Sequence, residues 1–98
     1  MSNMLARREA YISIPSRKKL RAAALEHDGT ISDEIATLLE DYANGTLVLG
    51  DEPEPESDEP PVRVRFKIDA DVWRSVRMRV LDEDTSVSAI IRRAIAAR

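Results

Sequence analysis

One order of hydrophobic patterns occurs twice in this sequence, in residues 9–45 and again in residues 62–98. In each copy a short alternating segment, typical of a strand with one buried face, precedes two segments with the spacing of amphipathic helices. A unit of roughly 35 residues buries too little apolar surface to be stable alone, and its single strand has no partner. The sequence therefore predicts two half-folds that complete one another by pairing their strands antiparallel above four helices.

The second copy has the more regular pattern. Residues 62–68 alternate between apolar and cationic side chains, which predicts a strand with one buried face and one charged face. The outward-facing cations are Arg63, Arg65 and Lys67. Asp69 is placed to cap a first helix and Ser86 to cap a second, whose apolar stripe predicts that it packs on a core.

The first copy has the same order with less regular patterning. Ile12 and Ile14 mark the buried face of a strand that ends at Pro15. The outward-facing residues are then Tyr11 and Ser13, with Glu9 at the edge of the strand. On this alignment the outward face has no cation, and the stretch from the strand to the second helix is two residues shorter than in the second copy.

Two helices are expected after this first strand. The first runs from about residue 16 to residue 27, and the turn at Asp28 and Gly29 separates it from the second. Thr30 and Asp33 have the spacing of a capping box at the start of the second helix. The turn Asn44-Gly45 is typical of a helix C-terminus and predicts where this helix ends.

The connection between the copies holds most of the acidic excess. Residues 51–61 contain six acids, four prolines and no base, so they are expected to be extended and solvated. The whole chain has a net charge of −3, yet residues 62–98 carry nine bases against five acids. The overall charge therefore does not argue against a nucleic-acid partner, because the second copy is a basic unit.

Composition excludes several kinds of site. The chain has no Cys and one His, His27, which removes disulfides, thiolate sites and multi-His metal clusters. No apolar run reaches the ~20 residues that span a bilayer, and no signal peptide is recognisable, so a cytoplasmic protein is expected. Because no catalytic constellation or Gly-rich phosphate loop occurs either, we expect a protein that is not an enzyme and has no cofactor or metal.

The repeated pattern resembles the ribbon–helix–helix family of DNA-binding proteins, of the Arc, MetJ and CopG type. The resemblance lies in residues 63–69 and 86–91 of the second copy and in residues 11–15 and 29–35 of the first. Family members are usually homodimers of one unit. This chain looks like a tandem version, as in some conjugation accessory proteins related to TraY.

The resemblance implies a mainly α fold with a two-stranded antiparallel β-ribbon. Two ribbon–helix–helix repeats, residues 9–45 and 62–98, would form one intramolecular pseudo-dimer joined by an acidic Pro-rich linker, residues 46–61. The protein would then be monomeric, with cooperative assembly on DNA as a further expectation. In another possibility each repeat pairs with the same repeat of a second chain.

The resemblance also implies which residues contact DNA. The ribbon would enter the major groove, where Arg, Lys, Ser and Tyr side chains can hydrogen-bond to base edges. The expected base contacts are Arg63, Arg65, Lys67, Tyr11 and Ser13. The start of each second helix would face a phosphate, since its free N–H groups and dipole favour an anion. The expected phosphate contacts are Thr30, Ile31, Ser32, Ser86, Val87 and Ser88.

The expected function is sequence-specific binding of double-stranded DNA, as a bacterial transcriptional repressor or as an accessory factor for plasmid transfer or maintenance. Because the two half-ribbons differ, the DNA site is expected to be imperfect or non-palindromic, with base contacts mainly from the second copy. The alternative is an antitoxin-like or anti-repressor module, in which residues 46–49 and the acidic linker bind a basic protein.

Several residues also have ordinary structural interpretations. The three cations of residues 63–67 would equally suit a solvated sheet face, and the serines would serve first as helix caps. Arg7 and Arg8 are interpreted as a solvated N-terminal segment or as a flexible arm that touches phosphate, and residues 17–19 as a solvated or DNA-steering surface. Trp73 and His27 are expected to pack and not to form a ligand or catalytic site.

Overall fold

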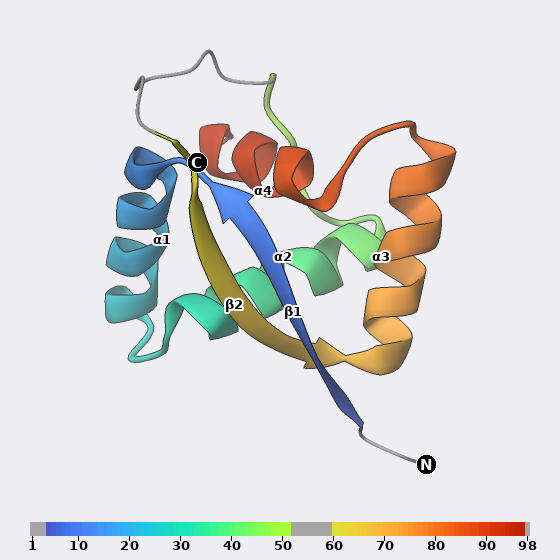
Figure 1. Cartoon of the computed structure of the whole chain (residues 1–98), viewed down its shortest axis with the longest axis horizontal. Helices are drawn as coiled ribbons and strands as arrows, with labels where there is room; N and C mark the ends of the chain where they lie inside the picture. Colours follow the sequence, from blue (N-terminus) through green and yellow to red (C-terminus); the bar gives the residue numbers. More distant parts are fainter. Residues whose placement is uncertain (1–3, 52–59, 98) are drawn as a thin grey trace.

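The structure is a computed structural model that describes residues 4–51 and 60–97. Within these residues the chain forms a two-stranded antiparallel sheet and four helices, a mixed α/β fold (Figure 1). The elements in chain order are β1 (Leu5–Ile12), α1 (Ile14–Glu26), α2 (Ile31–Asn44), β2 (Val62–Asp69), α3 (Ala70–Asp82) and α4 (Val87–Ala96). The predicted strand–helix–helix order is confirmed in both halves.

The two strands form a ribbon with one covered face. They pair antiparallel from Leu5 opposite Asp69 to Ile12 opposite Val62. The alternation predicted for β2 is confirmed, because its apolar residues are buried while the cations between them are exposed. In Figure 1 the ribbon crosses in front of the helices, so that the helices cover one face and leave the other face to solvent.

A single hydrophobic core lies between the ribbon and the helices. Each helix contributes fully buried side chains, among them Leu20, Ile35, Leu38, Val76, Ile90 and Ile91. Phe66 and Tyr42 are also buried in this core. Because the sequence has only four aromatic residues, the core is built chiefly from aliphatic side chains.

The helix ends follow the local chemistry of the sequence. Thr30 and Asp33 form the predicted capping box, in which each side chain accepts a hydrogen bond from the other residue's backbone N–H. Asp69 caps α3 and Ser86 caps α4, as predicted. Gly45 ends α2 in the left-handed region with φ of 75°, a conformation that glycine adopts without steric cost.

The first strand begins and ends earlier than predicted. β1 covers Leu5–Ile12, and Ile14 is the first residue of α1. The helix begins there because the Ser13 side chain accepts a hydrogen bond from the N–H of Ser16, and because Pro15 suits a first helical turn. The predicted bounds of the strand and of α1 are therefore wrong, and Ser13 lies at a helix cap and not on the ribbon.

With these bounds the two halves have equal spacing. The step along the chain from Ser13, the cap of α1, to Asp69, the cap of α3, is the same as the step from Thr30, the cap of α2, to Ser86, the cap of α4. We call this common step the repeat interval. The predicted two-residue difference between the copies is wrong, because it arose from the misplaced first strand.

The turns between the helices are also related by the repeat interval. Asp28 precedes Thr30 by as many residues as Asp84 precedes Ser86, and each of the two aspartates has a φ of 53°. This left-handed conformation is uncommon for residues other than glycine, although Asp tolerates it better than most. Equivalent turns therefore join the helices in both halves.

The chain after α2 runs along α4. Leu47 and Leu49 pack against the core, whereas Val48 is exposed. The N–H of Gly50 donates to the carbonyl of Arg93, and Nε of Arg93 donates back to the carbonyl of Gly50, both at 2.9 Å. The extended linker predicted for residues 51–61 lies mainly outside the described residues, which resume at residue 60.

Candidate nucleic-acid interface

The outward face of the ribbon presents three exposed side chains from each strand, and beyond them the register ends at Leu5 opposite Asp69, the cap of α3. They lie in three opposed pairs, Arg7 with Lys67, Glu9 with Arg65, and Tyr11 with Arg63. This set, the ribbon face, holds four cations and one carboxylate. The face is therefore basic although the chain as a whole is acidic.

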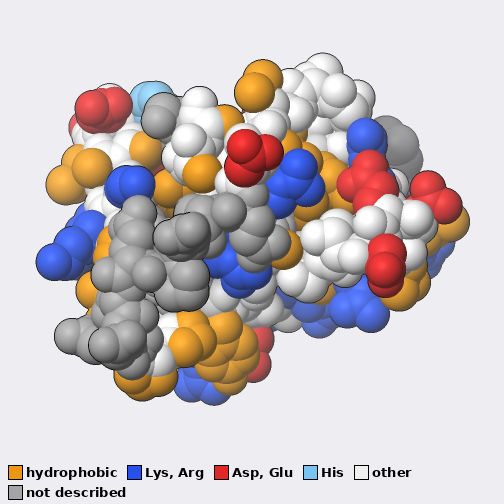
Figure 2. Space-filling view, turned by 90° about the horizontal axis from the view of Figure 1, so that it is seen from above, with side chains coloured by type: hydrophobic (Ala, Val, Ile, Leu, Met, Phe, Trp, Pro, Cys, Tyr) orange, Lys and Arg blue, Asp and Glu red, His pale blue; other side chains and the backbone are white. Residues whose placement is uncertain are grey.

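Acidic side chains gather elsewhere on the molecule. In Figure 2 the lower border, which corresponds to the front of Figure 1, shows Lys and Arg side chains at several points. Several Asp and Glu side chains gather at the right of this view, over the end of α3. The exposed acids of that region are Asp82, Glu83 and Asp84. These acids follow α3 and precede Ser86, the cap of α4.

Arg7 is the ribbon-face residue that the sequence analysis missed. Arg7 and Arg8 both lie in β1, so their interpretation as a flexible arm is wrong. Two-residue alternation backwards from Tyr11 leads to Glu9 and then to Arg7, which would have identified it. The signal was hidden because Arg8 occupies the next inward position, where an apolar residue is expected.

An aromatic surface accommodates Arg8 at this inward position. Its guanidinium carbon lies 5.5 Å from the centre of the Trp73 ring, and its Nη1 donates to the carbonyl of Arg7 at 2.9 Å. The Trp73 ring in turn packs against Phe66, with ring centres 5.9 Å apart. A cation over an aromatic face is attracted by the ring quadrupole, so Arg8 has a favourable partner while it remains exposed at the edge of the ribbon.

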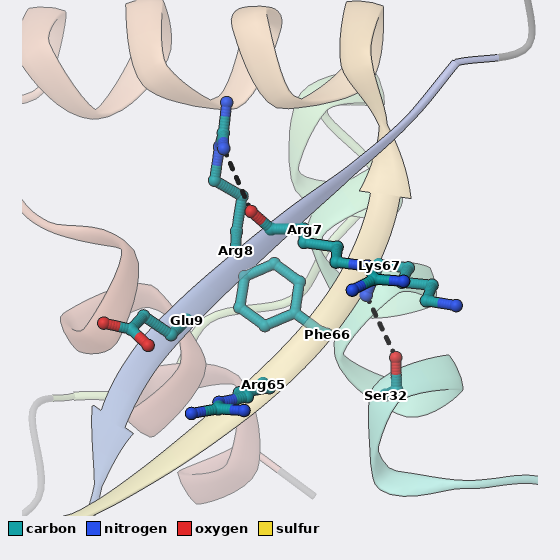
Figure 3. A pocket seen from close by; sticks show the side chains of 7 residues that line it. All are labelled: Arg7, Arg8, Glu9, Ser32, Arg65, Phe66 and Lys67. Carbon is teal, nitrogen blue, oxygen red and sulfur yellow. Dashed lines mark hydrogen bonds between the residues drawn. The ribbon is translucent and has the colours of Figure 1, made fainter.

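The N-termini of α2 and α4 lie at opposite edges of the ribbon. Ser32 Oγ accepts a hydrogen bond from the N–H of Lys67 on β2 at 3.1 Å, as Figure 3 shows. Ser88 Oγ accepts one from the N–H of Tyr11 on β1 at 3.3 Å. The repeat interval relates the two serines and also the two donors, and each bond ties one half's second helix to the other half's strand. The ribbon and both helix ends are thereby held in fixed relation.

The predicted phosphate contacts have defined roles in the fold. The side chains of Thr30 and Ser86 cap their helices, and the oxygens of Ser32 and Ser88 are engaged by the ribbon. The N–H groups in a helix's first turn have no partner within the helix. The N–H of the third residue in each helix is engaged by the cap, Asp33 by Thr30 and Ala89 by Ser86. What each helix offers an anion is therefore the N–H groups of its first two residues, with the positive end of the dipole behind them.

A hollow of about 470 Å³ lies against the ribbon beside the start of α2 (Figure 3). Its lining residues come from both strands and α2, and they are Arg7, Arg8, Glu9, Ser32, Arg65, Phe66 and Lys67. Glu9 is the only acid among them. This end of the ribbon thus brings together four cations from two strands next to a helix N-terminus.

Glu9 partly compensates one cation of the ribbon face. Its Oε2 lies 3.7 Å from Nε of Arg63, and both side chains are about half exposed, at 49% and 47%. Exposed ion pairs of this kind stabilise a fold very little, so both groups stay available to other partners. Among the described residues, the side chains of Arg7, Arg65 and Lys67 take part in no ion pair.

A second polar cluster joins the C-terminal ends of α2 and α3. The Tyr42 hydroxyl donates to Glu83, while Arg79 donates to Glu83 at 3.3 Å and to the Tyr42 carbonyl at 3.1 Å. Burial, with the neighbouring Glu83 carboxylate, raises the pKa of Tyr42 to about 12. The hydrogen bond from Tyr42 lowers the pKa of Glu83. The cluster stabilises the packing of the two helices.

The remaining candidates have structural partners. Nδ1 of His27 lies 2.6 Å from Oε1 of Glu34, which links the end of α1 to α2. Trp73 packs against the core, as predicted. The Ser13 hydroxyl donates to Ser16 at 2.9 Å, so the expected base contact is engaged within a helix cap. In the described ranges, no group of three or more His, Cys, Asp or Glu side chains is placed to hold a metal ion.

Comparison with known proteins found no matching family, no matching characterised protein and no matching solved structure. In the part of the chain that the structure describes, no helix is both long enough and apolar enough to cross a membrane.

Proposed function

We propose that this chain binds double-stranded DNA, with the ribbon face in the major groove and the N-termini of α2 and α4 against the phosphates on either side. The observation that carries the proposal is the combination of an exposed basic ribbon with a helix N-terminus at each edge. A two-stranded ribbon fits the major groove, which is about 12 Å wide.

The side chains of the ribbon face have the chemistry that major-groove recognition needs. Arg and Lys donate hydrogen bonds to O6 and N7 of guanine, and Tyr11 can donate or accept through its hydroxyl. Contacts from the two helix ends to phosphates would fix the register of the ribbon without specifying sequence. The same arrangement gives both affinity and specificity.

We further propose that the chain is a single-chain counterpart of a ribbon–helix–helix dimer. Three independent features recur at the repeat interval: the helix caps, the left-handed Asp turns and the serine-to-strand hydrogen bonds. They support one structural unit used twice. Because β1 pairs with β2 of the same chain, no second chain is needed to complete the ribbon.

A role as a repressor or as an accessory factor for plasmid transfer or maintenance fits this proposal, and catalysis forms no part of it. The antitoxin-like alternative has less support, because Leu47 and Leu49 pack against the chain's own core. Only Val48 of that apolar run is exposed.

The direct test is selection of duplex DNA from a random pool by the full-length protein, followed by sequencing and gel-shift titration. We expect one enriched motif, bound by a protein whose mass in solution is that of one chain. Absence of any binding to duplex DNA at low salt would contradict the proposal, since the electrostatic contribution to binding is strongest there.

A variant of the linker separates DNA binding from the alternative. Replacing the acids between residues 51 and 59 by Asn and Gln keeps the length of the connection and removes charge that repels phosphate. DNA affinity should stay constant or rise. Loss of a co-purifying protein, with DNA binding absent in both forms, would instead favour the protein-binding module.

A further inference from the structure

The ribbon has two chemically different ends. The end beside α2, the α2 end, carries Arg7 opposite Lys67. The end beside α4, the α4 end, carries Tyr11 opposite Arg63. Since the strands are antiparallel, each end contains one residue from each half of the chain. The chemical difference therefore separates the two ends of the ribbon and not the two halves of the sequence.

Positive charge is concentrated at the α2 end. Arg8 lies next to Arg7 at an inward position against Trp73. Within the described ranges none of the side chains of Arg7, Arg8 and Lys67 takes part in an ion pair, and the nearby carboxylate of Asp69 is engaged as the cap of α3. In Figure 3 the side chains of Arg7 and Lys67 lie together beside Ser32. At the α4 end Arg63 is the one cation of the ribbon face, and Glu9 lies 3.7 Å from it.

The two flanking helices differ in the charge of their first turns, and here the negative charge lies at the α2 end. The first turn of α2 carries Asp33 and Glu34, whereas the first turn of α4 carries no acid. Asp33 is engaged in the capping box and Glu34 is largely buried against His27, but both carboxylates still oppose an approaching phosphate. The turns before the two caps carry acids in both halves, Glu26 and Asp28 before α2 and Asp82, Glu83 and Asp84 before α4, where Glu83 is held by Tyr42 and Arg79. Because only α2 also carries acids inside its first turn, the start of α4 is the better phosphate site, and the α2 end of the ribbon is the better site for base contacts.

We propose that the protein binds its DNA in one fixed orientation, with guanines under Arg7 and Lys67 at the α2 end and mainly phosphate contacts at the α4 end. This inference rests on the proposed function. Arg is suited to guanine because it reaches O6 and N7 together, and Lys reaches the same acceptors. In the reversed orientation Arg7 and Lys67 would lie over the half of the DNA site that lacks the guanines. Binding in that orientation should therefore be weaker.

A pair of matched variants tests the inequality. Arg7 and Arg63 are related by the repeat interval, both exposed and both on the ribbon face, so Arg7→Gln and Arg63→Gln make the same chemical change at equivalent places. On the selected DNA, Arg7→Gln should weaken binding roughly 10- to 100-fold. Arg63→Gln should weaken it by less than about 5-fold, since the proposal places phosphate contacts, and no base contact from Arg63, at the α4 end. Equal losses, or a larger loss for Arg63→Gln, would overturn the proposal.

Orientation can be measured directly, because the chain has no natural cysteine. Glu26→Cys and Asp82→Cys introduce one thiol each, at exposed and equivalent positions at the ends of α1 and α3. An iron–EDTA group attached to residue 26 should cleave DNA at the guanine-containing end, and the group at residue 82 at the other end. Cleavage at both ends by each derivative would mean that both orientations are bound, which would overturn the proposal.

A third variant makes the two strands alike. Glu9→Arg combined with Tyr11→Lys gives β1 the same outward residues, in the same order, as β2. We expect the selected DNA to become palindromic, with guanines at both ends. A wild-type protein that selects a palindrome would overturn the fixed orientation alone, whereas a wild type that selects no DNA would overturn the proposed function.

Discussion

The two halves of the chain build equivalent elements from different sequences. In β2 the inward positions hold Val64, Phe66 and Ile68, all of them buried. The matching positions of β1 hold Arg8, Ala10 and Ile12, and only the last two are buried. The second half therefore supplies most of the hydrophobic surface of the sheet, and β1 depends on pairing with β2. The two halves share the spacing of their elements, although the side chains at matching positions differ.

Phe66→Ala should have the largest effect on stability. Phe66 is buried in the core, and truncating such a side chain destabilises by about 3–5 kcal/mol through lost burial and the cavity left behind. Ala10, its match in β1, is also buried, but Ala10→Gly should cost about 1 kcal/mol at most. Urea unfolding followed by circular dichroism measures both. Similar losses for the two variants would mean that the strands contribute equally.

Arg65→Ala should have the next largest effect, on binding. Arg65 lies at the centre of the ribbon face, and loss of a base contact should cost roughly 1–3 kcal/mol and relax the preference at one base position. Arg77→Ala is the control, since Arg77 is exposed on α3 outside this face. Unchanged affinity and site preference for Arg65→Ala in a gel-shift titration would count against the ribbon as the DNA-binding surface.

Removing the caps of α1 and α3 should have a smaller effect on stability. Asp69 accepts hydrogen bonds from two backbone N–H groups, whereas Ser13 accepts one. Alanine at either position should destabilise by about 1 kcal/mol, with the larger value for Asp69→Ala because a charged acceptor binds the helix end more strongly. Thermal unfolding of both variants, with Ser75→Ala on the exposed side of α3 as control, tests the order. A larger loss for Ser13→Ala would reverse it.

Glu9→Gln should have the smallest effect and the opposite sign. It removes the one acid of the ribbon face while keeping the size of the side chain, so DNA binding should strengthen by about 0.5 kcal/mol, a gain that falls with added salt. Stability should change little, because the contact with Arg63 is exposed and long. Weaker binding in a gel-shift titration would mean that Glu9 itself contacts a base, for example a cytosine amino group.

Features fixed by neighbouring residues could be predicted from the sequence. Thr30 with Asp33, Asp69 and Ser86 were identified as caps because their hydrogen bonds reach only two or three residues along the chain. β2 was identified because its alternation is complete. These elements were sufficient to predict the strand–helix–helix order of both halves.

Features that depend on distant contacts could not be predicted in the same way. Arg8 is compatible with a strand because Trp73, which comes from α3, provides a surface for its guanidinium group. Without that contact the start of β1 looked like a charged arm, and Arg7 was left out of the candidate site. The contact of Ser32 with Lys67 likewise joins opposite halves, so no local pattern indicated which helix flanks which end of the ribbon.

The crossed hydrogen bonds from Ser32 and Ser88 have a consequence for the covalent connection between the halves. Each half holds a strand and a helix end that the other half needs, so cleavage of the chain between residues 51 and 60 would leave a complex of two complementary fragments. Its stability would then depend on concentration, as in any dimer. The peptide connection fixes the effective concentration of each half for the other. The ribbon therefore stays assembled however dilute the protein becomes.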